Sequence, residues 1–484
     1  MEMEFALDAD SAAGLARTRA LTAQRDGRPR ASAIRIVWHD SPNTTLRSAG
    51  LAVAEDRDGW RIERLVPEQE TWLPAHPAPV LAHAAAAAEL PGLPGSLAAS
   101  LAPLAAFEGR HSTSVLVTDA GPVILSALRG TLRAVEAERP AARLWLSGAP
   151  PAVRAAMALA AGAAPITIPV ATLAAEGIAL ATGEPPPARH LGPPALPDPT
   201  MPVQEALRHI LGHLLDVVLA HAPAAGSDDE RSTDAVHQMR VAVRRARSAL
   251  SLFRPALPPD TFDQIRSRLK ALGTQLGPRR DWDVFLHETI SAVRGDLPDP
   301  EPLQRLAAAA ERQQRNHRKA LAAWLDSADY RLLTLDLAWY IAAIQEPPDP
   351  LPPLVEFAAG VLGQRHRKLI SLGKQMDGLD PAGLHQVRLR AKRVRYAAEM
   401  FATLHPARPA HRFIKRLSVL QQRLGVLNDG TVAATLLAQL GGPTGRYAYA
   451  AGLITGFLAA RAARMRPRVA RAYEKFRRRP PYWC

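Results

Sequence analysis

Residues 236–253 read VHQMRVAVRRARSALSLF, and residues 384–401 read LHQVRLRAKRVRYAAEMF. The two stretches lie 148 positions apart, and seven of their 18 positions are identical. A second pair follows at the same separation, because RLKALGTQLGPRRD at 268–281 matches RLSVLQQRLGVLND at 416–429. Agreement over two blocks at one separation, without an insertion, indicates a tandem duplication.

Each copy of the first block predicts an amphipathic helix with an apolar stripe beside a basic one. At about 100° per residue, the basic residues of each copy fall within an arc of about 80°. Arg245 and Arg393 flank these stripes on the far side. The stripes consist of His237, Arg240, Arg244 and Arg247 in the first copy and of His385, Arg388, Lys392 and Arg395 in the second.

A basic stripe without acidic residues at helical spacing destabilises its own helix by a few tenths of a kcal/mol for each like-charge pair. The simplest alternative is a solvated basic face. The same repulsion occurs in both copies, however, which favours neutralisation by an external anion. Arginine predominates, as expected for bidentate contacts with phosphate. Two such helices facing each other would form a groove suited to a long, flexible polyanion.

Charge is distributed unevenly along the 484 residues. Residues 1–200 hold 17 arginines, no lysine and 20 acidic residues, a balance of −3, whereas the rest of the chain stands at +17. The C-terminal part is therefore the candidate for a polyanionic partner.

The composition also divides the chain. A proline-rich linker at 183–200 separates an α+β domain at 1–182 from an all-α domain at 201–479, whose repeats span roughly 201–345 and 354–479. In the first domain, alternating segments predict a mostly antiparallel sheet. Its expected strands lie at 32–38, 59–65, 114–118, 123–128 and 143–146, and its expected helices at 82–89 and 151–161.

Several classes of protein and site are disfavoured. No apolar run is long enough to span a membrane, and the first residues lack a signal peptide's pattern, so we expect a cytoplasmic protein. The single cysteine, Cys484, leaves no intramolecular disulfide and no cysteine-based metal site. His209 and His213 have metal-ligand spacing but no evident third ligand, so we predict no metal site there and no cofactor.

The motif His-x-x-Arg-x-x-x-Arg/Lys-Arg-x-Arg, followed by Leu-Gly-x-x-x-Asp at an expected helix start and then repeated, resembles the CHAD (conserved histidine α-helical) family. The resemblance implies two four-helix bundles related by pseudo-two-fold symmetry. It also implies binding of inorganic polyphosphate in a basic groove and a place on polyphosphate granules. The implied polyphosphate-binding residues are His237, Arg240, Arg244, Arg245, Arg247, Arg268, His385, Arg388, Lys392, Arg393, Arg395 and Arg416. Asp281 and Asp429 would be helix N-caps or partners of these arginines.

The first domain resembles a degenerate member of the CYTH (triphosphate tunnel metalloenzyme) family, which often precedes CHAD domains. Glu2-x-Glu4 is similar to the opening of that family's Glu-x-Glu-x-Lys strand, but Ala6 replaces the lysine. The later Glu-x-Glu strand reads Arg143-Leu-Trp-Leu-Ser147. A triphosphate tunnel needs cations for the phosphates and carboxylates for a divalent metal. We therefore predict no catalytic residues and no enzymatic activity.

Two other functions remain open. The domain order and Glu2-x-Glu4 fit a metal-dependent triphosphatase of the CYTH type. A basic groove would also attract nucleic acid, although the stripes lack interleaved aromatic residues for base stacking and no DNA- or RNA-binding fingerprint is present.

Overall fold

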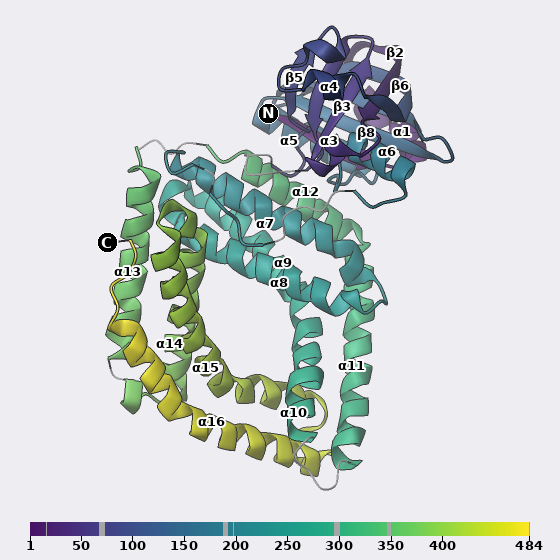
Figure 1. Cartoon of the computed structure of the whole chain (residues 1–484). Coiled ribbons are helices and arrows are strands. Elements are labelled where there is room, and N and C mark those ends of the chain that lie inside the picture. The colour runs from purple at the N-terminus through teal and green to yellow at the C-terminus, as the bar shows by residue number, and fades with distance from the viewer. Residues whose placement is uncertain are drawn as a thin grey trace. The chain divides into compact units, whose positions relative to one another are not determined.

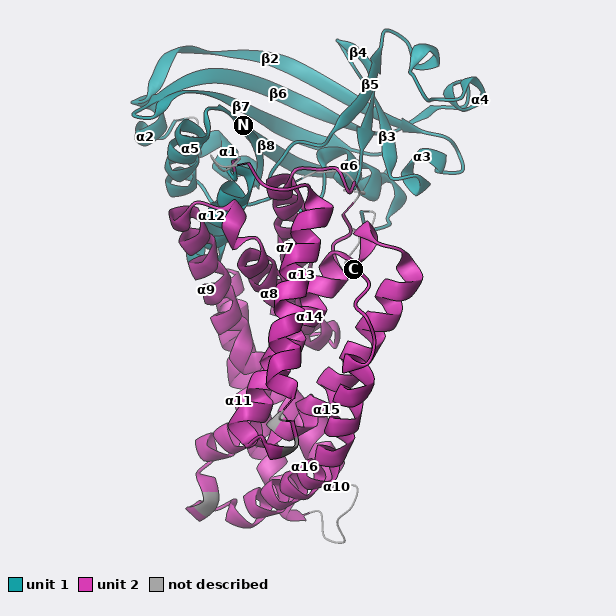
Figure 2. Ribbon diagram, turned by 90° about the vertical axis from the view of Figure 1, so that its left-hand side faces the viewer, with its two compact units in different colours: residues 1–192, 327–344 teal, residues 193–326, 345–484 magenta. Residues whose placement is uncertain are grey.

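The computed structural model describes residues 1–15, 17–66, 73–186, 192–196, 198–294, 301–345, 350–374 and 376–483. The chain forms two compact units, one comprising residues 1–192 and 327–344 and the other residues 193–326 and 345–484 (Figure 2). Part of the predicted linker, residues 187–191 and 197, lies outside the described residues, as does Cys484.

Unit 1 is built on one antiparallel eight-stranded sheet with the order β1-β8-β7-β6-β2-β3-β4-β5. The long central strands β2, β6, β7 and β8 curl over their length (Figure 2). The predicted antiparallel α+β domain is confirmed. The strands are β1 (Glu2–Leu7), β2 (Arg25–Asp40), β3 (Leu51–Asp56), β4 (Gly59–Arg64), β5 (Val80–Ala84), β6 (Ala102–Thr118), β7 (Gly121–Arg133) and β8 (Glu138–Gly148).

The strands β6 and β7 pair closely where two glycines face each other. A Cβ on Gly109 would lie 2.7 Å from the Cα of Gly130, so side chains at these positions would force the strands apart. The prediction of a helix at 82–89 is wrong, because β5 occupies its start and a 3-10 turn its end. The alanines of this segment pair with β4 at the sheet edge, and this pairing overrides their helical propensity.

Helices pack against the sheet and complete unit 1. The predicted helix at 151–161 is present as α5 (Pro150–Ala163). The other helices before residue 183 are α1 (Ala9–Leu15), α2 (Arg19–Thr22), α3 (Thr45–Ser48), α4 (Gly95–Ala98) and α6 (Leu173–Thr182).

Unit 1 also contains α12 (Ala328–Ala342), which the sequence places inside the first helical repeat. The Trp339 Nε1–H donates to the carbonyl of Pro150 at 3.0 Å. The guanidinium of Arg154 lies over the rings of Trp339 and Tyr340, 4.7 Å from each centroid. These contacts attach α12 to α5, so the division into units does not follow chain order at this helix.

Unit 2 consists of two successive sets of helices, labelled in Figure 1. The first copy comprises α7 (Val203–Gly226), α8 (Arg231–Leu252), α9 (Pro259–Val284) with its continuation α10 (Ser291–Arg294), and α11 (Glu301–Leu325). The second comprises α13 (Leu354–Gly373), α14 (Pro381–Met400), α15 (Ala407–Gln439) and α16 (Ala448–Arg477). No described helix is long and apolar enough to cross a membrane.

The duplication read from the sequence is also present in the element bounds. The ends of α8 and α14, the 3-10 turns Arg254–Ala256 and Ala402–Leu404, and the starts of α9 and α15 are all 148 positions apart. The second matched block does not begin a helix, however, because Gly277 and Gly425 lie inside α9 and α15. The predicted all-α domain with two repeats is confirmed, and the predicted helix starts at these glycines are wrong.

The two repeats share buried side chains. Trp282, Phe285 and Leu303 of the first repeat pack in one cluster with Leu436 and Ile454 of the second. The N-terminal halves of α8 and α14 bury their apolar stripes as expected, including Val236, Met239, Val243, Leu384, Val387 and Ala391. Burial of these stripes fixes the direction in which the basic stripes point.

Candidate functional site

The helices α8 and α14, which carry the two motif copies, contact each other in unit 2. Their contact brings together Arg240 and Arg244 of α8 with Arg388, Lys392 and Arg395 of α14, a group that we call the basic cluster. The pKa of Lys392 shows how close these cations are. It is lowered to about 8 by burial and then by the charges of Arg388, Arg244, Arg395 and Arg240. Cations of both repeats therefore act on one ammonium group.

The guanidinium groups of the cluster show the same crowding. Loss of hydration lowers the pKa of Arg244, and the charges of Arg395 and Arg245 lower it further. Burial lowers the pKa of Arg388, and Arg244 of the other repeat adds to this effect. Like charges at this spacing repel each other, so the arrangement costs stability unless an anion is present.

Carboxylates neutralise part of the cluster. Arg240 lies 3.6 Å from Asp281, and Glu399 lies 3.0 Å from Arg395 and accepts from Arg245 at 3.5 Å. Among the described residues, Arg244, Arg388 and Lys392 have no carboxylate within ion-pair distance. The Nε–H of Arg388 is buried and has no hydrogen-bond partner there. Unsatisfied positive charge therefore remains at the centre of the cluster.

Tyr396 orients two of the arginines. The guanidinium of Arg244 lies 5.3 Å from the centroid of its ring, and that of Arg395 lies 5.4 Å from it. The ring is buried, so it provides a fixed aromatic face between the two repeats. A cation–π contact stabilises a guanidinium without neutralising it, which leaves the charge of Arg244 able to bind an anion.

The two motif histidines occupy different surroundings. Burial lowers the pKa of His237, and the nearby charges of Arg280 and Arg244 lower it further. His237 is therefore neutral at pH 7 and can act as a hydrogen-bond donor or acceptor, not as a fixed cation. His385 lines a cavity between α14, α15 and α16.

The structure places the remaining predicted residues outside the basic cluster. Arg247 and Arg393 are both exposed. Arg393 lies near Arg365, and burial together with the charge of Arg393 lowers the pKa of Arg365 to about 10. Arg268 on α9 donates to the backbone and side-chain oxygens of Gln264 at 3.1 and 2.7 Å. Arg416 is half-buried on α15. None of the four is among the charges that lower the pKa of Lys392 most.

The two motif aspartates are not helix N-caps, since both lie within continuous helices. Asp281 is instead an ion-pair partner of Arg240. Burial raises the pKa of Asp429, and the charges of Arg461 and Arg388 oppose this shift. Gly277 has a related role, because a Cβ there would lie 3.2 Å from Nη1 of Arg240. The Leu-Gly-x-x-x-Asp motif therefore supports the arginine stripe in the first repeat, and Gly277 allows Arg240 to lie close to α9.

Arg280 was not among the predicted site residues. It affects the pKa of both His237 and Arg240 and lies 3.6 Å from Glu288. The feature of the sequence that pointed to Arg280 was its position next to Asp281 in the matched block. The second repeat has Asn428 there, so the duplication gave no reason to choose it.

In unit 1 the carboxylate of Glu4, from the Glu2-x-Glu4 motif, is paired with an arginine. The Arg143 guanidinium lies 3.2 Å from Glu4 and 2.8 Å from Glu176. Burial raises the pKa of Glu4 to about 7, although Arg143 opposes this shift. The carboxylate of Glu63 contributes to the raised value and is itself paired with Arg61.

In the part of the chain that the structure describes, no three histidine, cysteine, aspartate or glutamate side chains are grouped so that they could hold a metal ion. The His209 Nε2–H donates to the carbonyl of Ala195 at 2.8 Å, and the side chain is buried. This histidine contacts the backbone of unit 2.

Comparison with known proteins gives a consistent assignment for the helical unit. The family model described as the CHAD domain matches residues 209–438, which include both motif helices. The crystal structure of the CHAD domain from the plant Ricinus communis is 30% identical, with a TM-score of 0.50, and the match covers 57% of this chain and 93% of that one. PptA from Streptomyces chartreusis matches at 18% identity and a TM-score of 0.44, over 57% of this chain and 100% of that one.

Two curated relatives come from Mycobacterium tuberculosis, the uncharacterized proteins MT2285 of strain CDC 1551 and Rv2226 of strain H37Rv. Each is 28% identical over 262 residues, or 52% of this chain. The chain spans about half the length of the curated relatives it matches, 49% in both cases. Since the plant structure is matched over nearly its whole length and the family model spans both motif helices, the chain belongs to the CHAD family.

Proposed function

We propose that the protein binds inorganic polyphosphate through the basic cluster, with His237, His385, Arg245, Arg247, Arg268, Arg393 and Arg416 extending the contacts along a basic groove. The observation that carries the proposal is that cations of both repeats meet over the ring of Tyr396, while Arg244, Arg388 and Lys392 have no described carboxylate within ion-pair distance. The lowered pKa of Lys392 agrees with this crowding. A site with so much positive charge and so few carboxylates favours a ligand with several negative charges.

The cluster favours phosphate over a carboxylate ligand because of its composition. Four of its five members are arginines, whose planar guanidinium groups bind phosphate oxygens in pairs. The buried Nε–H of Arg388 adds a donor without a partner. An oxygen-rich anion would satisfy this donor and reduce the repulsion that lowers the pKa of Lys392.

A chain of phosphates fits the arrangement better than a single phosphate group. The predicted residues follow two helices of about six turns each, so a linear polyanion contacts several of them in succession. CHAD membership supports polyphosphate as this polyanion, since the motif resemblance implies it. We extend the proposal to association with polyphosphate granules, which fluorescence microscopy of tagged protein in polyphosphate-accumulating cells would test.

Nucleic acid is the second candidate, because duplex DNA and RNA also bind basic surfaces. The stacking surface that single strands need is limited here. Tyr396 is buried and covered by two arginines, so it offers no free ring for a base. We therefore place nucleic acid second to polyphosphate.

We also propose that unit 1 is catalytically inactive. Glu2 and Glu4 both match the Glu-x-Glu strand, but Glu2 is exposed. Arg143 and the raised pKa both reduce the ability of the buried Glu4 to hold a divalent cation. A metal-dependent triphosphatase needs several free inward carboxylates. The pairing of Glu4 with Arg143 and of Glu63 with Arg61 supports a scaffolding or interaction role for this unit.

The decisive experiment is competition binding on the full chain. Labelled long-chain polyphosphate is displaced by unlabelled polyphosphate, duplex DNA, ATP or triphosphate at about 0.15 M salt, the physiological ionic strength. We expect polyphosphate to compete at least tenfold better than DNA. Equal competition by DNA would replace the polyphosphate proposal with the nucleic-acid one.

A matched pair of variants locates the site. Arg244→Gln with Arg388→Gln removes two charges from the cluster, and Arg477→Gln with Arg479→Gln removes two exposed charges at the end of α16. The first pair should weaken polyphosphate binding by about 100-fold, from roughly 1.4 kcal/mol for each lost charge-assisted contact, and the second pair by less than about threefold. Equal losses would mean that only total charge matters.

A further inference from the structure

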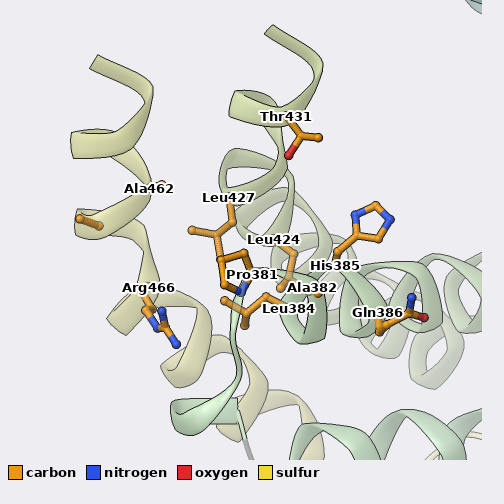
Figure 3. A pocket seen from close by; sticks show the side chains of 11 residues that line it. Pro381, Ala382, Leu384, His385, Gln386, Leu424, Leu427, Thr431, Ala462 and Arg466 are labelled. Carbon is orange, nitrogen blue, oxygen red and sulfur yellow. The ribbon is translucent and has the colours of Figure 1, made fainter. Parts of the chain in front are cut away.

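A cavity of about 460 Å³ opens between α14, α15 and α16 of the second repeat (Figure 3). Leu384, Leu424 and Leu427 form much of its wall. The guanidinium of Arg466 lies on one side of these leucines, and the ring of His385 lies on the other (Figure 3). The cavity thus combines a broad apolar wall with a cation at one edge.

In the first repeat, buried polar side chains occupy the corresponding place. Arg279 and Asp283, one helical turn apart on α9, form an ion pair at 3.1 Å and are 4% and 0% exposed. The Gln314 Nε2–H donates to Asp283 at 2.6 Å, and Arg279 donates to the hydroxyl of Thr233 at 3.2 Å. Side chains from α8, α9 and α11 therefore fill the first repeat at this point.

The second repeat lacks all four of these groups. At the separation of 148, Leu427 corresponds to Arg279, Thr431 to Asp283, and Pro381 to Thr233. At the separation of 149 that relates the basic stretches of α11 and α16, Ala463 corresponds to Gln314. All four replacements line the cavity. The second repeat therefore has no counterpart of the buried polar network at these four positions.

The chemistry of the lining indicates what occupies the space. A volume of several hundred Å³ with a mainly apolar wall and a few polar groups is typical of small-molecule sites. Arg466 is the cation of the lining and donates to the carbonyl of Leu379, without a carboxylate partner among the described residues. We propose that this cavity binds a small molecule with an apolar body against the leucines and one anionic group at Arg466.

This proposal does not depend on polyphosphate binding, and its test uses no polyphosphate. The full chain is titrated with anilinonaphthalene sulfonate, an apolar anion whose fluorescence rises on burial, and with phenylnaphthylamine, the same ring system without the sulfonate. We expect one saturable site for each probe. The absence of saturable binding of either probe would overturn the proposal.

Two sets of variants assign the probes to the cavity. Leu427→Arg with Thr431→Asp and Ala463→Gln transfers the filling side chains of the first repeat into the second. It should weaken both probes at least tenfold while circular dichroism shows unchanged helix content. If the triple variant does not fold, the single change Ala463→Phe at an exposed lining position replaces it. Unchanged probe binding by a folded, filled variant would refute the proposal.

Arg466→Gln tests the anionic group. It should weaken the sulfonate about tenfold and leave phenylnaphthylamine unchanged, whereas Arg464→Gln, at an exposed position on the same helix, should change neither. Equal weakening of both probes by Arg466→Gln would show that Arg466 only shapes the cavity, and the assignment of an anionic ligand would be wrong.

Discussion

Lys392→Arg should remove most of the pH dependence of polyphosphate binding between pH 7 and pH 9. In the free protein, burial and four neighbouring arginines lower the pKa of Lys392 to about 8. The ammonium group therefore loses its proton within this pH range. A bound polyanion would counter the arginine charges and return the pKa toward its ordinary value of about 10.4. Binding above pH 8 would then require the uptake of a proton.

The sign and size of the effect follow from linkage. Because the bound state holds the proton more tightly than the free state, affinity falls as pH rises through the free protein's pKa. With values of about 8 free and about 10.4 bound, the affinity at pH 9 would be about tenfold below that at pH 7. Lys392 is only half-buried, so solvent screening reduces this limit, and we expect a decrease of about threefold to tenfold.

The measurement is a fluorescence-anisotropy titration of labelled polyphosphate at pH 7, 8 and 9 with constant ionic strength, for the wild type and Lys392→Arg. Arginine stays charged throughout this range, so the variant's affinity should change by less than about twofold. Lys368→Arg, at an exposed position on α13, is the matched control and should keep the wild-type dependence. A wild-type affinity that is constant from pH 7 to pH 9, or an equal decrease in Lys392→Arg, would refute the assignment of Lys392 to the site.

Three further predictions concern catalytic activity, salt dependence and stability. With Mg²⁺ or Mn²⁺, the protein should release no more phosphate from triphosphate or ATP than a metal-free control, because the carboxylate of Glu4 is paired with Arg143. Metal-dependent phosphate release in a malachite-green assay would contradict this. The logarithm of polyphosphate affinity should fall linearly with the logarithm of salt concentration, as it does for duplex DNA at about 0.9 per phosphate neutralised, while the preference over DNA persists in the same titration. Asp283→Ala should destabilise unit 2 by about 3–5 kcal/mol, since it leaves the buried charge of Arg279 unpaired. Thr431→Ala at the exposed equivalent position should change stability by less than about 0.5 kcal/mol, and equal losses of thermal stability in the two variants would refute the contrast.

The candidate site was predictable where one helix defines it. The spacing of Arg240 and Arg244 gave the basic face of α8, and the copy at Arg388 and Lys392 gave that of α14. Helical periodicity places such residues on one side of a helix whatever surrounds them. The separation of 148 also predicted matching elements, and the bounds of the helices and 3-10 turns agree with it.

Contacts between helices were less predictable. The carboxylate of Glu399 pairs with Arg245 of the other repeat, and Tyr396 lies under Arg244, also of the other repeat. Neither contact follows from helical spacing alone, because one partner comes from a different helix. Similarly, the sequence predicts a helix start at Gly277, but within α9 this glycine gives Arg240 the space to approach.

By itself, the sequence determined the duplication, the class of each unit and the residues of the two basic stripes. These depend on local order along the chain, where a period of 3.6 or 2 residues fixes which side chains share a face. Only the tertiary structure decided that five of the predicted cations converge while Arg268 and Arg393 lie elsewhere. It also decided that α12 joins unit 1 and that Leu427 and Ala463 line a cavity. The physical reason is that repulsion, ion pairing and void volume depend on distances between elements, and packing of the buried faces sets those distances.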